Sequence, residues 1–248
     1  MFESDPASPY ESDAGGSGSA SDAVFFGIVQ GLENQSFVPG QRLVEADLAT
    51  TFGVSRNSVR EGLHRLVAEG VVELLRHKGA VIRSLTIEDT LGVLDVAELM
   101  TGLLARSAAR DGGPEAAQTR EIKQILRELA DSDKARDLAR FSVARRRFYR
   151  ALLTLGRNQE LRRLFPAIHM PIVYAQHRLP ALQQLRLKDY ALIAEAVISG
   201  DPKRAEETGR SHVRNVRRCI VETAKWSQTR PGASPEFTSG SEFVPQTD

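Results

Sequence analysis

The chain has 248 residues, 41% hydrophobic and 26% charged, which is an ordinary globular balance with enough apolar material for a buried core. Its formal net charge of +1 excludes a polycation that binds nucleic acid through bulk charge, so any such binding needs a local basic cluster. The single cysteine excludes an internal disulfide and a cysteine-based zinc site, and it fits a reducing cytoplasm.

No apolar run approaches the roughly 18 residues that a membrane span needs, and the first residues lack the basic and apolar regions of a signal peptide. Residues 1–21 and 228–248 are rich in Ser, Gly, Pro and Thr or in acids, so we expect two disordered tails. Between them, residues 22–84 mix short helices with turn signals, and residues 86–227 form one helical pattern after another. The sequence therefore predicts a mainly α protein with two folded parts.

The first folded part alternates short helices with turn residues. Asp22 is expected to cap the first helix, Gly53 breaks the second because it can adopt a positive φ, and Ser55 caps the third. Two β-prone runs around a basic tip predict a hairpin. The predicted elements in chain order are helix Asp22–Leu32, turn Val38–Gly40, helix Glu45–Thr51, helix Ser55–Glu69, and strands Val71–Leu75 and Ala80–Ile82.

The second folded part is punctuated by caps, glycines and prolines. Thr86 and Asp89 have the spacing of a capping box, Pro114 suits the first turn of a helix, and Asp201 is expected to cap the last helix. The predicted helices are 86–112, 114–133, 135–155, 159–177 with interruptions at Pro166 and Pro171, 180–199 and 202–227. About six helices with short connections predict an antiparallel bundle.

The third helix has the residues that a DNA-recognition helix needs. Arg56 and Arg60 are four residues apart and therefore project from one face, where an arginine can donate two hydrogen bonds to guanine or clamp a phosphate. Asn57 and Ser58 add neutral donors at the helix start. The alternative is an ordinary solvated arginine face, but the order of turn, cap, apolar face and hairpin favours a winged helix-turn-helix.

Seven segments of this first part resemble the DNA-binding head of the GntR family of bacterial transcriptional regulators. They are Pro39–Leu43, Glu45–Ala49, Gly53–Arg56, Val59–Glu61, Leu66, Glu69–Val72 and Lys78–Val81. The sequence departs from the family where Thr-Pro is common, here Asn57-Ser58, and where Ala-Leu is common, here Gly62-Leu63. A basic residue that some members carry is replaced by Ala46.

The resemblance implies a recognition helix facing bases and nearby phosphates, and a wing whose tip lies close to the minor groove. The residues that it assigns to DNA are Arg42, Ser55, Arg56, Asn57, Ser58, Arg60, Lys78 and Gly79. One head makes few phosphate contacts, so we expect a homodimer on a short inverted repeat of operator DNA.

The helical part resembles, more loosely, the effector domain of the FadR branch of that family. The match rests on Leu94–Leu99, Arg106, Ala108-Ala109, Phe148, Leu152, Gly156, Asn158, Ala196, Gly200-Asp201, Ala205 and His212. Most members of that branch hold a divalent metal through an Asp and a His four residues apart and a His on each of two later helices. These positions are Arg145, Tyr149, Tyr190 and His212 here. A guanidinium repels a cation, so we predict neither a metal nor a cofactor, with His169 and His177 as the alternative ligands.

The same four side chains suit an anion instead. We predict that Arg145, Tyr149, Tyr190 and His212 bind a small organic acid or phosphate, with Arg106 as a second anion clamp. The alternatives are an internal ion pair of Arg145 with Glu98, and of Arg106 with Asp95 or Glu98.

The sequence therefore predicts a ligand-responsive DNA-binding regulator, a repressor by the habit of the family, whose effector changes operator affinity through linkage. A rival interpretation is a constitutive DNA binder with a vestigial pocket. The sequence has no nucleophile–base pair, phosphate-binding Gly-rich loop or paired catalytic carboxylates, so we predict that it is not an enzyme.

Overall fold

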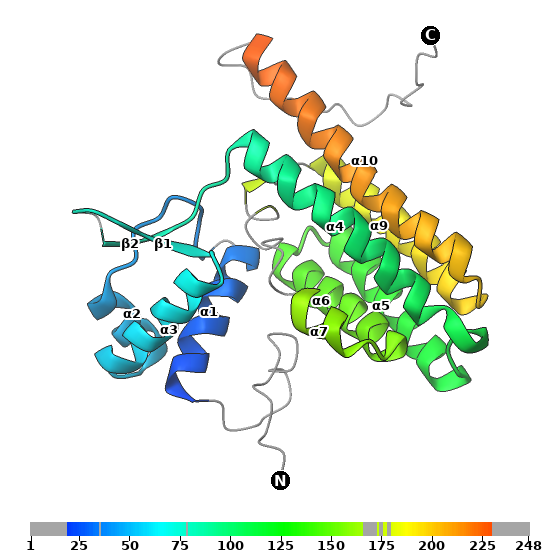
Figure 1. Ribbon diagram of the computed structural model, residues 1–248, viewed down its shortest axis with the longest axis horizontal. Coiled ribbons are helices and arrows are strands. Elements are labelled where there is room, and N and C mark those ends of the chain that lie inside the picture. Colours follow the sequence, from blue (N-terminus) through cyan, green and yellow to red (C-terminus); the bar gives the residue numbers. More distant parts are fainter. Residues whose placement is uncertain are drawn as a thin grey trace.

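The computed structural model describes residues 19–34, 36–77, 79–165, 173, 176–177 and 180–229, and it places a small N-terminal part beside a larger helical bundle (Figure 1). None of the helices within these residues is long and apolar enough to cross a membrane. The predicted fold class is confirmed, with a winged helix-turn-helix followed by an all-helical part.

The N-terminal part, called the head below, packs three helices against an antiparallel hairpin. Its elements are α1 (Ala20–Asn34), α2 (Glu45–Phe52), α3 (Arg56–Ala68), β1 (Val72–Leu75) and β2 (Gly79–Ile82). The prediction that Asp22 caps α1 is wrong. The backbone N–H of Ser19 donates to Asp22 Oδ2 at 2.9 Å and the N–H of Asp22 donates to Ser19 Oγ at 3.2 Å, so Asp22 lies inside the first turn.

The turn between α2 and α3 follows the prediction closely. Gly53 ends α2 with φ 64°, a left-handed conformation that strains residues with a Cβ. Ser55 caps α3 by accepting from the backbone N–H of Ser58 at 3.2 Å. Val59 and Leu66 on the inner face of α3 are fully buried, so the helix is held by its apolar side and leaves its polar side open.

The wing is short and is tied to the rest of the head by a third segment. Val72 pairs with Ile82, and Arg42, which lies just before α2, forms an isolated bridge with Val81. His77 at the tip adopts φ 68° and is exposed. Lys78, which we expected at this tip, lies outside the described residues.

The bundle contains six α-helices and one 3₁₀ turn among the described residues. They are α4 (Ile87–Ala108), η1 (Arg110–Gly112), α5 (Ala116–Lys134), α6 (Leu138–Gly156), α7 (Gln159–Leu164), α9 (Pro180–Ile198) and α10 (Pro202–Thr229). α10, the longest, packs along α4 and α9 (Figure 1).

Most predicted helix ends of the bundle are correct within a few residues. The capping box of Thr86 and Asp89 is present, and Asp201 Oδ1 accepts from the N–H of Arg204 at 3.0 Å. Two expectations are wrong: Pro114 lies before the N-cap Glu115 rather than in the helix, and α6 begins at Leu138 after an aspartate cap, not at residue 135. The helix expected over 159–177 ends at residue 164, and Pro166 and Pro171 lie outside the described residues.

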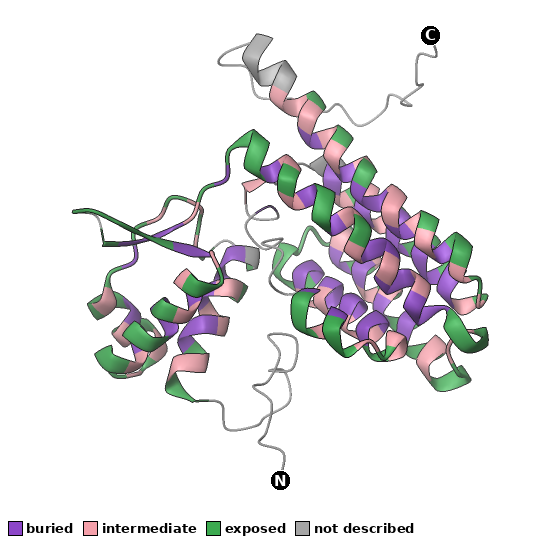
Figure 2. Ribbon diagram, viewed as in Figure 1, coloured by how far each residue is buried: buried purple, intermediate pink, exposed green. Residues whose placement is uncertain are grey.

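Among the described residues, the buried apolar side chains form two cores (Figure 2). One fills the bundle around Phe148 and Leu104. The other starts inside the head, passes through Leu85 between β2 and α4, and continues to Val216 and Ile220 on α10. The head therefore shares buried surface with the bundle and is not joined to it by a linker alone.

Candidate DNA-binding head and buried polar cluster

The recognition helix presents its polar side chains to solvent. Arg56, Asn57 and Arg60 are exposed, and Asn57 Nδ2 donates to Glu61 Oε1 at 3.2 Å. Ser55 and Ser58 are partly used by the helix cap, because their hydroxyls lie 2.9 Å apart. Of the predicted readers on α3, the two arginines and Asn57 are therefore the ones best placed to meet DNA.

Arg60 is held by an acidic side chain at the start of α2. Its Nε donates to both carboxylate oxygens of Glu45, at 2.9 and 3.1 Å, and the two side chains are 60% and 38% exposed. This contact uses the Nε side of the guanidinium and leaves the fork of Nη1 and Nη2 available. That fork is the part of arginine that donates two parallel hydrogen bonds to guanine. Sequence reasoning did not identify Glu45 as part of the site.

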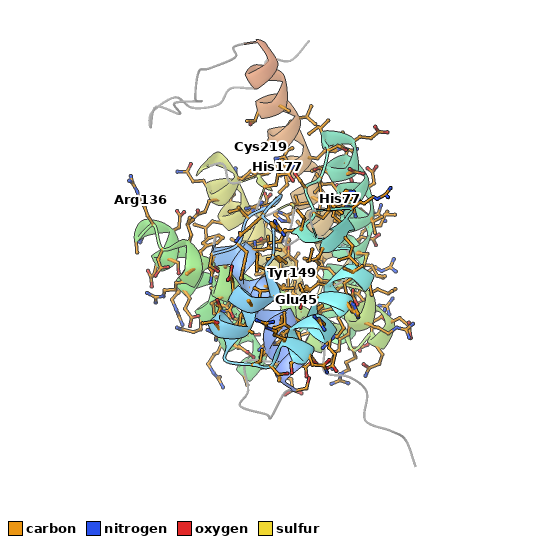
Figure 3. The ribbon with its side chains drawn as sticks, turned by 90° about the vertical axis from the view of Figure 1, so that its left-hand side faces the viewer. Glu45, His77, Arg136, Tyr149, His177 and Cys219 are labelled. Carbon is orange, nitrogen blue, oxygen red and sulfur yellow. The ribbon has the colours of Figure 1, made fainter. Side chains whose placement is uncertain are left out.

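A hollow of about 300 Å³ lies between α3, the start of α2 and the wing. Arg42, Arg60 and Gly79 line it together, with His64 and Leu74 beside them. The structure thus brings three predicted DNA-contacting residues from three segments to one surface. Figure 3 shows Glu45 on the side of the head that faces the viewer.

Inside the bundle, the four residues at the family's metal positions come together from α6, α9 and α10. Arg145 and His212 are 4% and 2% exposed, and Arg145 acts electrostatically on His212. The ring centroids of Tyr149 and Tyr190 lie 5.8 Å apart, and those of Tyr190 and His212 lie 5.0 Å apart. This group, together with Arg186 and Asp189 described next, is called the buried polar cluster.

Asp189 is a member of the cluster that sequence reasoning missed. It is 5% exposed, and His212 Nδ1 lies 3.0 Å from its Oδ2, while Asn215 Nδ2 donates to both of its oxygens at 3.3 Å. The sequence carried only a partial signal for Asp189, namely its spacing from Arg186 and Tyr190. Asp189 follows Arg186 by three residues and directly precedes Tyr190, and all three side chains are buried on the inner side of α9.

Burial favours the neutral form of His212. Desolvation lowers its pKa, the charges of Arg186 and Arg145 act in the same direction, and the hydrogen bond and charge of Asp189 oppose them. Because a carboxylate can only accept, Nδ1 carries the proton and donates to Asp189, which leaves Nε2 as a hydrogen-bond acceptor. The cluster therefore offers cationic, phenolic and neutral imidazole groups at once.

Arg186 extends the cluster toward the head. It is 7% exposed and acts electrostatically on His177, Cys219 and His212. Neither Arg186 nor Arg145 is free, since each makes further interactions within the chain, so an incoming anion would have to exchange with existing partners.

Comparison with known proteins fits this geometry. Residues 20–82 match the bacterial regulatory proteins of the gntR family, and residues 92–215 match the FCD domain. The chain belongs to the GntR family. It is therefore a transcriptional regulator with a helix-turn-helix head and a regulatory domain of the FadR C-terminal type, and its relatives are regulators rather than enzymes.

Two curated relatives carry repressor names. A probable D-xylose utilization operon transcriptional repressor of Paenarthrobacter nicotinovorans is 26% identical over 178 residues, 70% of this chain and 76% of the relative. The HTH-type transcriptional repressor GlaR of Escherichia coli is 25% identical over 187 residues, 72% of this chain and 85% of the relative. The solved Escherichia coli protein McbR/YncC has the same fold, with a TM-score of 0.71 at 17% identity, covering 84% of this chain and 99% of that one.

The side chains of this GntR-family protein do not fit the divalent metal that the resemblance to the FadR branch implies. Within the described residues, no three His, Cys, Asp or Glu side chains lie close enough to share an ion. The guanidinium of Arg145 occupies the place of a ligand and opposes a cation. Of the alternative ligands, His169 lies outside the described residues, and His177 Nε2 lies 3.4 Å from the hydroxyl of Thr90.

The ion pairs that were the alternatives to anion binding are not the ones that the described residues form. Arg106 Nη1 donates to Glu206 Oε2 at 3.1 Å, rather than pairing with Asp95 or Glu98. Asp95 pairs with Arg217 instead. Glu98 accepts from Arg214 at 3.2 Å, so the described contacts give no support to its pairing with Arg145. Sequence spacing cannot predict these pairs, because the observed partners of Arg106, Asp95 and Glu98 all lie on α10.

Proposed function

We propose that this GntR-family regulator acts in the cytoplasm, binds operator DNA as a homodimer, and loses or changes that affinity when a small anionic metabolite binds the buried polar cluster. The observation that supports DNA reading most directly is the fork of Arg60, held at the surface of α3 by Glu45. The residues assigned to DNA are Arg42, Ser55, Arg56, Asn57, Ser58, Arg60, Lys78 and Gly79.

The homodimer is supported by an exposed apolar strip on the bundle. Val96 and Leu99 on α4 are 49% and 57% exposed, and they lie on one side of the helix. Contiguous exposed apolar surface is a common feature of protein–protein contact sites. A second copy of the chain covering this strip would hold two heads on the two half-sites of an inverted repeat.

The proposed effector site consists of Arg145, Tyr149, Tyr190 and His212. A guanidinium supplies the charge for a carboxylate or phosphate, and the phenols and imidazole supply hydrogen bonds. Arg106 is a second candidate clamp, but it would first have to leave Glu206. The rival proposal, a constitutive regulator, requires only that Arg145 keep its internal partners and accept no ligand.

Selection of bound DNA from a random pool tests the first half of the proposal. We expect an enriched inverted repeat that gives the half-site sequence and spacing, and no enrichment would refute operator binding. Calorimetry of the wild type and Arg145→Lys with a panel of small organic acids and inorganic phosphate tests the second half. Binding to the wild type with at least tenfold weakening in the variant supports the effector site. Absence of binding across the panel favours the constitutive regulator.

A further inference from the structure

The connection between the wing and α4 forms two hydrogen bonds with a single side chain, that of Gln176, which lies 91 residues further along the chain. Leu85 N–H donates to Gln176 Oε1 at 2.9 Å, and Gln176 Nε2 donates to the carbonyl oxygen of Leu85 at 2.6 Å. One amide side chain thus satisfies both backbone groups of one residue. Leu85 itself is 4% exposed, so neither backbone group can turn to bulk water without moving the chain.

Two residues close to Gln176 in the sequence, Val173 and His177, make further contacts in the same region. Val173 is fully buried in the core that runs from the head to α10, and the N–H of His177 donates to its carbonyl oxygen at 3.0 Å. His177 Nε2 lies 3.4 Å from Oγ1 of Thr90, a fully buried residue in the first turn of α4. Gln176 and His177 together therefore hold both the connection and the start of the helix that follows it.

We propose that Gln176 is the positioning residue that fixes the head against the bundle by binding both backbone groups of Leu85. This proposal needs neither ligand nor DNA. Loss of the two hydrogen bonds frees the peptide at Leu85, three residues after the end of β2, and lets the head change its angle.

Amide hydrogen exchange on the full chain tests the two hydrogen bonds between Gln176 and Leu85. Gln176→Leu keeps the size of the side chain and removes both hydrogen bonds, so the Leu85 amide should exchange about fivefold to tenfold faster. Gln176→Glu keeps the acceptor for the Leu85 N–H but sets a second carboxylate oxygen against the Leu85 carbonyl oxygen, so it should restore only part of the protection. Gln184→Leu, at an exposed site on α9, is the matched control and should leave the exchange unchanged.

The orientation of the head is tested by spin-label distances. In a Cys219→Ser background, labels at Ala68→Cys on α3 and Lys123→Cys on α5, both exposed positions, report the distance between head and bundle. Labelled protein is diluted with unlabelled chain so that only distances within one chain contribute. Gln176→Leu should broaden or shift the distribution, and Gln184→Leu should not.

Unchanged exchange in Gln176→Leu would refute the role of the two hydrogen bonds, and faster exchange with an unchanged distance distribution would refute the role of Gln176 in head orientation. A failure to bind DNA would overturn the proposed function and leave both results standing.

Discussion

Glu45 holds Arg60 through the Nε side of its guanidinium. The Nε of Arg60 donates to both oxygens of Glu45, and the Nη1–Nη2 fork remains available at the surface of the recognition helix. Glu45 is the first residue of α2, and Arg60 lies one turn into α3, so the two helices of the motif are joined at the point where DNA is expected. Such an exposed ion pair adds little stability, and its main effect is on side-chain orientation.

Removal of the guanidinium tests whether Arg60 reads a base. Arg60→Ala should weaken binding to the selected operator by about 1–3 kcal/mol, the cost of one lost bidentate contact to guanine. Fluorescence anisotropy with the selected operator and a scrambled duplex measures both affinities. Arg163→Ala, an exposed arginine on α7 whose ion pair with Glu160 is also exposed, is the control. Wild-type operator affinity in Arg60→Ala would place the recognition surface elsewhere.

Neutralising Glu45 should raise the non-specific affinity for DNA and lower the specificity of binding. Glu45→Gln removes a negative charge from the DNA-facing surface, so affinity for a scrambled duplex should rise. Loss of the ion pair also frees Arg60 to sample other rotamers, which should lower the ratio of specific to non-specific affinity about twofold to fivefold. The same anisotropy assay measures the ratio at fixed salt. A ratio that stays the same or increases would show that Glu45 does not position Arg60.

Alanine substitutions at two helical glycines, Gly62 and Gly92, distinguish the energetic cost of tight packing from the gain in helix propensity. A Cβ on Gly62 of α3 would lie 2.8 Å from the Cβ of Val24 and 3.0 Å from the carbonyl oxygen of Ser21, both on or beside α1. Alanine improves a helix by about 1 kcal/mol over glycine, but overpacking costs about 1–3 kcal/mol. Gly62→Ala should therefore lower the free energy of unfolding or leave it nearly unchanged.

Gly92→Ala is the matched control for this prediction. Gly92 lies within α4, and a Cβ there would meet no atom within 4 Å. Urea unfolding should show a gain of about 0.5–1 kcal/mol for Gly92→Ala. Equal gains in both variants would mean that α1 moves away from α3 at little cost, and that Gly62 is not required by the packing of the head.

The sequence was sufficient for features that depend on local chemistry. The cap at Ser55, the turn at Gly53 and the capping box of Thr86 each need only residues that lie within four positions of one another, so their pattern is visible in the sequence. The resemblance to a known family also brought Arg145 and His212 to one place, although they lie 67 residues apart, because it supplied the bundle's alignment of helices.

Contacts between elements distant in the sequence could not be predicted. Asp189 was missed because its role depends on α10 placing His212 against it, and Gln176 was missed because its partners are backbone atoms of Leu85, which have no sequence signature. The ion pairs of α4 were misassigned for the same reason. All of these contacts connect one part of the molecule to another, so they matter most for regulation.

Buried histidines predict a loss of stability in mild acid. Burial lowers the pKa of His212 and of His177 below the value of about 6.5 that a histidine has in the unfolded chain. Between the folded and unfolded pKa values, the unfolded state binds more protons, so the free energy of unfolding rises with pH. Stability should therefore fall as the pH drops below about 6.5, by at most about 1.4 kcal/mol per pH unit for each histidine.

Urea unfolding between pH 7.5 and 5 at constant ionic strength measures this slope, and substitution assigns it. His212→Asn keeps a donor for Asp189 and should remove the contribution of His212, so the stability difference from the wild type should shrink as the pH falls. His177→Asn should remove the rest, and the double variant should be nearly independent of pH down to about 5, above the ordinary range of the carboxyl groups. A full slope in the double variant would mean that other groups gain protons on unfolding, and that burial of these two histidines does not account for the pH dependence.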